Sequence, residues 1–266
     1  RGRVAEQRVT YSHDVMSEHL FDFIRIHHTQ PFLCHVHWTI PHANNEGGRV
    51  TGDGMEVPDH GVYAGKDWPS PEKGQAAMIT RMDRDFGRLI KLLQELGIQR
   101  RTLVIFTSDN GPHSEGGHKH EFFDSNGPLR GFKRDLYEGG IRVPTIAWWP
   151  GVIQPNTTSD EPLAFWDFLP TACELAGVKT PTDTDGVSLM PTLLGNRQGP
   201  AHESLFWRYG QKVALRSAEW KIVRTKKGAD WELYNLSSDV GESRDVAKEH
   251  SDIVERLAAM AVAAES

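Results

Sequence analysis

Two oxygen-bearing side chains follow one apolar run of the sequence at the point where we expect a strand to end. Asp109 and Asn110 follow residues 102–107 after a single serine, Ser108, and precede Gly111. Carboxylate and amide oxygens are hard donors, which suit calcium or magnesium better than a soft metal. Asp-Asn-Gly is also a common turn sequence. Taken alone, the pair therefore leaves both a metal site and an ordinary turn open.

A lysine and two histidines are placed in the sequence where they could act on an anionic substrate. Lys133 lies in the glycine-rich segment 127–144, His113 lies close after the Asp-Asn pair, and His42 lies far upstream. A lysine ammonium can neutralise anionic oxygens, and an imidazole can protonate a leaving group near neutral pH. The alternatives are a solvated surface lysine next to Arg134 and histidines with a structural role.

Two motifs in order resemble the sulfatase family. Residues 107–111 match the metal-binding Thr-Ser-Asp-Asn-Gly of that family, and residues 131–140 match its signature Gly-x-Lys-x-x-x-Tyr-Glu-Gly-Gly. The likeness extends to Pro41-His42, to residues 82–85 and to residues 233–236, so it covers nearly the whole chain. The sequence is similar to the carboxy-terminal portion of members named arylsulfatase or N-acetylgalactosamine-6-sulfatase.

The resemblance implies a sulfuric ester hydrolase of the alkaline-phosphatase-like superfamily and assigns roles to individual residues. It makes Asp109 and Asn110 calcium ligands, and it places Lys133 and His42 as catalytic residues against the sulfate ester. The chemistry agrees, because a sulfate ester carries delocalised negative charge and a poor alkoxide leaving group. Preorganised cations and a bound dication would stabilise its transition state. His113 is the next candidate for contact with the substrate.

Four further polar residues near the two motifs receive lesser roles. We expect Glu138 and Arg142 to orient the signature segment through ion pairs rather than to take part in the chemistry. His118 and His120 raise the possibility of zinc, but a catalytic zinc site usually needs three suitably spaced protein ligands. We therefore do not expect zinc here.

The nucleophile that the family uses has no counterpart in this sequence. In the family it is a formylglycine made from the first residue of Cys/Ser-x-Pro-Ser/Ala-x-Arg, and neither Cys34 nor Cys173 lies in such a motif. Both cysteines are predicted to be small core residues. The paired aspartates that complete the family's calcium site are absent as well, and calcium needs about six to eight oxygen ligands. We therefore expect a missing amino-terminal segment of the same protein, or another chain, to supply the formylglycine and the remaining ligands.

Composition and charge exclude several other classes of function. The chain has 266 residues, of which 38% are hydrophobic and 25% charged, as in a globular protein with a sizeable core. Its formal net charge of −6 gives no basic field for nucleic acid. No apolar run approaches the roughly 20 residues that span a bilayer. No secretory signal is visible at residues 1–7, so a periplasmic or extracellular location is expected from the resemblance alone.

Hydrophobic periodicity predicts a mixed α/β fold. The resemblance implies an alkaline-phosphatase-like sandwich with a mostly parallel central sheet, incomplete here, formed by residues 1–200. Residues 201–266 are expected to form a small subdomain with an antiparallel sheet and a helix. The predicted helices cover residues 13–27, 72–96, 165–176 and 247–263. The predicted strands cover residues 31–38, 102–107, 143–149, 204–209, 212–216, 220–224 and 231–235. Residues 44–71 are expected to form a loop at the rim of the site that selects substrates.

Three functions remain open at this stage. The first is a calcium-dependent sulfatase that cleaves aryl or carbohydrate sulfate esters, for which a sulfated small molecule or glycan would be the partner. The second is a phosphate-ester or phosphonate hydrolase of the same superfamily, which would need further metal ligands for a two-metal site. The third is a non-catalytic remnant. The motif around Lys133 favours sulfate.

Overall fold

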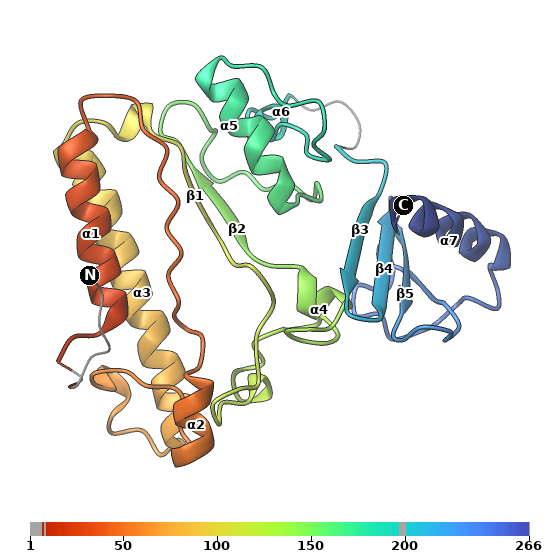
Figure 1. Ribbon diagram of the computed structural model, residues 1–266, viewed down its shortest axis with the longest axis horizontal. Coiled ribbons are helices and arrows are strands. Elements are labelled where there is room, and N and C mark those ends of the chain that lie inside the picture. The colour runs from red at the N-terminus through yellow and green to blue at the C-terminus, as the bar shows by residue number, and fades with distance from the viewer. Residues whose placement is uncertain (1–6, 8, 197–200, 266) are drawn as a thin grey trace. The chain divides into compact units, whose positions relative to one another are not determined.

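The chain forms two compact units in the computed structural model, which describes residues 7, 9–196 and 201–265 (Figure 1). The first unit combines the chain up to Leu103 with His113–Ser125, and the second combines Val104–Pro112 with the chain from Asn126 onward. The predicted division after residue 200 falls beside a segment outside the described residues, and it stays a prediction. Within the described residues, no helix is long and apolar enough to cross a membrane.

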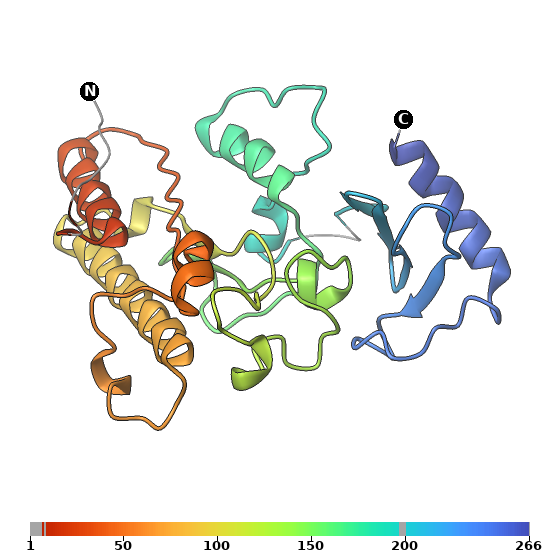
Figure 2. The same ribbon diagram turned by 60° about the horizontal axis from the view of Figure 1, so that its bottom comes forward.

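Two long helices dominate the first unit, and both were predicted from their periodicity. Helix α1 spans Ser12–His27 and helix α3 spans Ser70–Glu95, and the two lie side by side in both views (Figures 1 and 2). Helix α3 stops where Gly97 adopts a φ of 68°, the left-handed conformation that glycine reaches without strain. The short helix η2, Gln99–Arg101, follows.

The buried face of α3 differs from the predicted one. Hydrophobic periodicity predicts a buried face formed by Ala76, Ile79, Met82, Phe86, Leu89, Ile90 and Leu93. Of these only Leu93 is fully buried, and Ile79 is 44% exposed. The buried face runs instead through Met78 and Asp85, and Asp85 is fully buried. The periodicity counted apolar residues alone, whereas this helix buries a carboxylate in a polar network with α1.

Two other predictions for the first unit need correction. Residues 31–38 form no strand, and within the described part of the chain they hydrogen-bond to none of the six strands. Residues 44–71 are not a plain loop, because they contain helix α2, Asn45–Thr51, and the turn η1, Gly61–Tyr63. The Asn44 side chain accepts a hydrogen bond from Gly47 N at 3.0 Å and so caps α2, a local signal that the loop prediction overlooked. Turn η3, His120–Phe123, completes this unit.

The second unit contains a strand pair that matches two predicted strands. Strand β1, Val104–Thr107, pairs with β2, Thr145–Trp148. The pairing is antiparallel, and so is every other strand pair among the described residues. The predicted parallel sheet is therefore not seen in this part of the chain; antiparallel edge strands on otherwise parallel sheets are common. Besides the last helix of the chain, the helical elements of this unit are α4, Glu138–Ile141; η4, Phe165–Asp167; α5, Phe168–Ala176; and α6, Met190–Leu193.

A four-stranded antiparallel meander closes the chain, as predicted. Its strands are β3, Leu205–Tyr209; β4, Lys212–Ser217; β5, Trp220–Arg224; and β6, Glu232–Asn235. Helix α7, Ser251–Glu265, packs on one face of this sheet (Figure 2). On that face Leu215 and Ile222 form a core with Leu257 of α7. On the opposite face Ala214 packs with Tyr137 of the glycine-rich signature segment. The sheet thus separates α7 from the signature.

Candidate active site

The Asp-Asn pair lies in a turn at the end of β1. The Asp109 side chain is exposed and Asn110 is half-buried. Ser108 Oγ donates to the Asn110 backbone oxygen at 2.9 Å. The end of the strand pair is held by a 3.0 Å hydrogen bond between the hydroxyls of Thr107 and Thr145. A carboxylate and an amide therefore stand at a strand end, as the sequence predicts.

Two backbone hydrogen bonds join this turn to the signature segment. Gly111 N donates to the Gly140 carbonyl at 3.0 Å, and Lys133 N donates to the Pro112 carbonyl at 2.7 Å. Both bonds lie within the second unit. The Asp-Asn turn and the lysine segment are therefore one hydrogen-bonded structure, although they are separate in the sequence.

Glycines are required where the two segments meet. A Cβ atom on Gly111 would lie 1.8 Å from the Gly139 carbonyl oxygen, and one on Gly139 would lie 2.2 Å from the Gly131 carbonyl oxygen. Backbone atoms cannot move aside as a flexible side chain can. The spacing of glycines in the two motifs is thus explained by a close approach of backbones.

The donor set at this turn fits part of a calcium site. Asp109 and Asn110 supply the oxygen donors that calcium prefers, but the ion takes about six to eight ligands. Within residues 7, 9–196 and 201–265, no group of three or more His, Cys, Asp or Glu residues is placed to hold a metal. The described residues therefore fit a calcium site only as contributors of two ligands.

His42 and His113 come together in the first unit, with ring centroids 6.0 Å apart. His42 Nδ1 donates to the Ala43 carbonyl at 2.8 Å, which leaves Nε2 as the atom that can bind or release a proton. That nitrogen lies 3.7 Å from a carboxylate oxygen of Glu115. The His42 side chain is 49% exposed, so a ligand can reach it.

Both ring nitrogens of His113 are used by the backbone. Nδ1 accepts a hydrogen bond from Glu115 N at 3.1 Å, so Nε2 carries the proton and donates to the Pro41 carbonyl at 2.9 Å. The ring is 7% exposed. This geometry favours a role in holding the backbone next to His42. The contact of His113 with substrate stays a prediction.

Glu115 is a residue near His42 that sequence reasoning missed. Its carboxylate accepts a hydrogen bond from Asn45 Nδ2 at 3.3 Å, so it connects α2 to the His113 segment. Two backbone contacts support the same connection, since Gly54 N donates to Gly116 O and Asn44 N donates to Gly54 O. Nothing in the spacing of Glu115 in the sequence indicated this pairing with His42.

The other histidines of this segment bind protein groups. His118 is buried, and its Nδ1 contacts the Glu72 carboxylate on α3. His120 Nδ1 lies 2.6 Å from the Ser114 hydroxyl. Glu72 also accepts a hydrogen bond from Lys119 N at 3.0 Å. The segment is thus fixed to α3 by a buried carboxylate.

The ion pair predicted for the signature is present but is not the strongest one. Arg142 Nη1 lies 3.8 Å from Glu138, whereas Lys221 Nζ on β5 lies 2.8 Å from the same carboxylate. Lys221 and Glu138 are both buried. Their pairing joins residues far apart in the sequence, and no local pattern indicated it.

The two cysteines show no sign of a catalytic role. Cys34 and Cys173 are both free and half-buried, so each is less buried than predicted. Burial raises the pKa of the Cys34 thiol, which disfavours the reactive thiolate.

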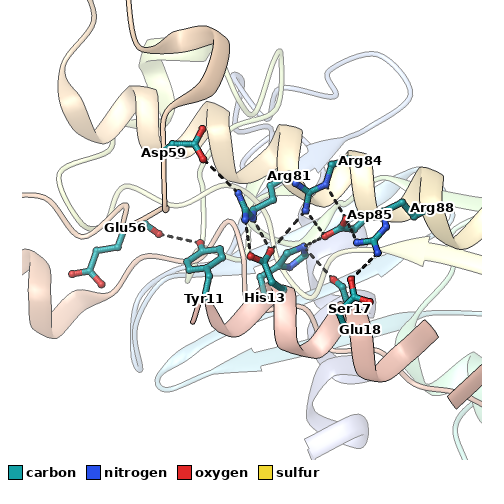
Figure 3. Close-up of polar contacts among 11 residues, drawn as sticks. Tyr11, His13, Ser17, Glu18, Glu56, Asp59, Arg81, Arg84, Asp85 and Arg88 are labelled. Atoms are coloured by element: carbon teal, nitrogen blue, oxygen red, sulfur yellow. Dashed lines mark hydrogen bonds and ion pairs between the residues drawn. The ribbon is translucent and has the colours of Figure 1, made fainter. Parts of the chain in front are cut away.

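A Ser-His-Asp cluster between α1 and α3 resembles a hydrolytic triad only in composition (Figure 3). His13 Nε2 lies 3.1 Å from Asp85 and 3.4 Å from the Ser17 hydroxyl, so one nitrogen faces both partners. In a triad the base uses one nitrogen for the nucleophile and the other for the carboxylate. All three residues are fully buried. The cluster is therefore a structural network.

Comparison with known proteins identifies the relatives of this chain. The sulfatase family model matches residues 3–178, and the model described as "N-sulphoglucosamine sulphohydrolase, C-terminal" matches residues 119–263. Steryl-sulfatase of Rattus norvegicus is 40% identical over 218 residues, covering 75% of this chain and 34% of the relative. N-acetylgalactosamine-6-sulfatase of the same species is 35% identical over 237 residues, covering 85% of this chain and 40% of the relative. The chain spans less than half the length of these two curated relatives.

Solved structures share the fold and confirm the predicted fold class. One is Ps i-CgsB in complex with k-i-k-neocarrahexaose, with a TM-score of 0.79, 24% identity and coverage of 94% of this chain and 54% of that one. Another is a protein in complex with its substrate D-glucosamine-2-N,6-O-disulfate, with a TM-score of 0.69, 19% identity and coverage of 96% and 69%. The chain therefore shares the fold of these two proteins, in agreement with the fold that the resemblance implied. Since the family model matches more than half of the sequence, the chain belongs to the sulfatase family.

Proposed function

We propose that this chain is the carboxy-terminal part of a calcium-dependent sulfatase that cleaves aryl or carbohydrate sulfate esters. Membership of the family supports the reaction class. The observation that carries the proposal is the hydrogen bond from Lys133 N to Pro112 O. It holds a cationic segment against the turn of Asp109 and Asn110, as the binding of a sulfate group would require.

Charge stabilisation is the role proposed for the residues of the second unit. Lys133 would neutralise the sulfate oxygens and the charge that grows on the bridging oxygen as the S–O bond breaks. Asp109 and Asn110 would hold calcium, which when bound supplies further positive charge at a sulfate oxygen. The formylglycine nucleophile is expected in an amino-terminal segment outside this chain.

Proton transfer is the role proposed for His42. Its Nδ1 is fixed by the Ala43 carbonyl, so a protonated Nε2 would donate to the leaving oxygen. The Glu115 carboxylate, 3.7 Å from Nε2, would balance the charge of the protonated ring. The hydrogen bonds of His113 to Pro41 and Glu115 would hold the His42 ring and the Glu115 carboxylate at this separation.

Substrate choice is proposed to depend on residues 44–71, in which Asn45 hydrogen-bonds to Glu115 and Gly54 hydrogen-bonds to Gly116. The partner would be a sulfated small molecule or glycan, because relatives are named for steryl sulfates and for N-acetylgalactosamine 6-sulfate. Export to the periplasm or the extracellular space is proposed from family membership.

Turnover of paired sulfate and phosphate esters tests this function in the protein at its natural length. We expect hydrolysis of 4-nitrophenyl sulfate, inhibition by a calcium chelator, and little turnover of 4-nitrophenyl phosphate. Lys133→Ala should lower kcat/KM by about 10²–10³-fold, as for the loss of one preorganised charge. Lys179→Ala is the matched control, since Lys179 is exposed and lies in neither motif. Faster turnover of the phosphate ester, or full activity of Lys133→Ala, would contradict the proposal.

A further inference from the structure

A buried lysine lies beneath the signature segment. The Lys221 side chain is fully buried, with its Nζ 2.8 Å from Glu138 and 2.9 Å from Glu242. A lysine is almost never buried without such partners. Two carboxylates and one ammonium together carry a net negative charge. Arg216 and Arg142 supply positive charge nearby, since they lie 3.9 and 3.8 Å from the Glu138 carboxylate.

The alternation of side chains along β5 points Lys221 at the signature. Ile222 faces α7, so its neighbours on the strand face the other side of the sheet. Lys221 is paired with Tyr234 on β6, and Tyr234 packs with Tyr137 of the signature. Strand β5 therefore places the Lys221 ammonium next to the Glu138 carboxylate.

Glu242 provides a second restraint on Glu138. Its carboxylate accepts a hydrogen bond from Glu138 N at 2.6 Å, while its own backbone oxygen accepts one from Arg130 Nη1 at 3.0 Å. Burial raises the pKa of Glu242, although Lys221 opposes that rise. Lys221 thus holds the side chain of Glu138, and Glu242 holds its backbone N–H.

The restraint continues from Glu138 to the Asp-Asn turn. Glu138 begins helix α4, in which Gly140 offers its carbonyl to Gly111 N at 3.0 Å. Gly111 directly follows Asn110 in the sequence. Lys221 is therefore connected to the proposed calcium ligands through Glu138, the backbone of α4 and the hydrogen bond between Gly140 and Gly111.

A second lysine from the sheet holds the segment next to Lys133. Lys212 Nζ, on β4, donates to the Arg134 carbonyl at 2.9 Å and to Asp135 Oδ1 at 2.8 Å. Arg134 adopts a φ of 77°, a left-handed conformation that costs a non-glycine residue free energy. The Lys212 hydrogen bond to Arg134 helps to hold that conformation, directly after Lys133.

We infer that Lys221 and Lys212 are positioning residues for the sulfate-binding charges. Lys221 fixes the Asp109-Asn110 turn through Glu138, and Lys212 fixes the backbone that carries Lys133. The carboxy-terminal sheet is then part of the active-site framework rather than a separate module. The kinetic part of this inference rests on the proposed function, whereas its structural part does not.

Amide exchange tests the structural part in the protein at its natural length. Peptides covering residues 109–112 and 131–134 report on the Gly111 and Lys133 amides. Lys221→Met should speed exchange at the Gly111 amide, and Lys212→Met should speed exchange at the Lys133 amide. We expect about tenfold or more in each case, because the free energy of local opening falls. Lys227→Met, an exposed lysine after β5, is the matched control and should change neither amide. Unchanged exchange in both test variants would overturn the inference.

Comparing kcat for two esters with different leaving groups shows whether Lys212 positions Lys133 or only stabilises the fold. A displaced Lys133 stabilises the departing oxygen less, so phenyl sulfate should lose more kcat than 4-nitrophenyl sulfate, whose leaving group is better. We expect a loss of about 10²-fold for phenyl sulfate in Lys212→Met, as for a small misplacement of a catalytic group. Equal losses for both esters would mean fewer active molecules and would overturn the inference.

Two further outcomes are distinguishable. If Lys221→Met does not fold, Lys212→Met decides alone, because Lys212 is 32% exposed and its loss leaves no buried charge unpaired. If the wild-type protein hydrolyses neither ester, the proposed function fails. The exchange measurement would then still show whether the two lysines hold the segments.

Discussion

The backbone N–H of Lys133 donates to the carbonyl oxygen of Pro112 at 2.7 Å. Together with the hydrogen bond from Gly111 N to the Gly140 carbonyl, this bond joins the segment of the proposed sulfate-binding lysine to the turn of the proposed calcium ligands. Any change that separates the two backbones should therefore impair both functions at once. Side-chain changes on either segment should impair only one.

Gly111→Ala is predicted to disrupt this junction. The new Cβ would lie 1.8 Å from the Gly139 carbonyl oxygen, so the backbones must separate. We expect a loss of stability of about 1–3 kcal/mol, typical of overpacking, and a fall in sulfatase kcat/KM of about 10²-fold. Urea unfolding and steady-state kinetics would measure the two effects.

Gly87→Ala serves as the control for that substitution. Gly87 lies within α3, and a Cβ there meets nothing within 4 Å. Alanine should stabilise this helix by about 0.5–1 kcal/mol and leave turnover unchanged. A Gly111→Ala protein as stable and active as this control would contradict the close approach.

Asp109→Ala is predicted to weaken calcium binding without unfolding the second unit. The carboxylate is exposed, so its removal leaves no buried group unpaired. Loss of one charged ligand should raise the calcium Kd by about tenfold or more. Titration of the natural-length protein with calcium, followed by isothermal calorimetry, would measure the change. Asp160→Ala, another exposed aspartate in the same unit, should bind as the wild type does.

Sequence reasoning succeeded where a signal was local. The helices α1 and α3 and the meander β3–β6 follow from hydrophobic periodicity, and the Asp109-Asn110 turn follows from its motif. It failed for residues 31–38, because an apolar run specifies a strand only when a partner strand is present to bond it.

Pairs of residues distant in the sequence account for the rest. The contact of Glu115 with His42 and that of Lys221 with Glu138 depend on how the chain folds back on itself. Asp85 was missed for another reason, because a carboxylate on an amphipathic helix is expected to face solvent. Its burial is possible only because arginines and a histidine surround it (Figure 3).

Acid is predicted to destabilise the first unit through His13. Burial lowers the pKa of His13, so the unfolded chain binds its proton at a higher pH than the folded chain does. The contribution to stability is complete above about pH 6.5, and it is lost progressively as the pH falls below that value. Urea unfolding at pH 7.5 and pH 5.5 would measure the loss. In His13→Gln the pH dependence over this range should be smaller.

Asp85→Asn is predicted to destabilise the same unit at neutral pH. Burial alone would raise the pKa of Asp85, but hydrogen bonds from Arg84 and Arg88 outweigh it and hold the pKa at about 2. Removing the charge leaves His13 and two arginines without their common partner, at a cost of roughly 2 kcal/mol. Asp83→Asn, at an exposed position of the same helix, is the control. Equal unfolding midpoints for the two variants would argue against the network.

Tyr234→Phe is predicted to loosen the signature from the carboxy-terminal sheet. The Tyr234 hydroxyl accepts a hydrogen bond from Arg130 at 2.8 Å and donates one to Glu232 at 2.7 Å. Arg130 also lies 3.8 Å from the ring centroid of Tyr137, so it links strand and signature. Loss of both hydrogen bonds should cost about 1–2 kcal/mol in urea unfolding. Tyr209→Phe, at a tyrosine that is 49% exposed, should cost nothing measurable.

Alkaline pH is predicted to destabilise the protein through deprotonation of the Tyr234 hydroxyl. Burial, and then the hydrogen bond to Glu232, raise the pKa of Tyr234, so the folded chain keeps its proton after the unfolded chain has begun to lose it. This contribution to stability is complete below about pH 10, the value for an unperturbed tyrosine, and it falls as the pH rises further. Wild-type stability should therefore drop between pH 9 and pH 11 more steeply than that of Tyr234→Phe. Parallel curves for the two proteins would show that Tyr234 is not held in the neutral form by this contact.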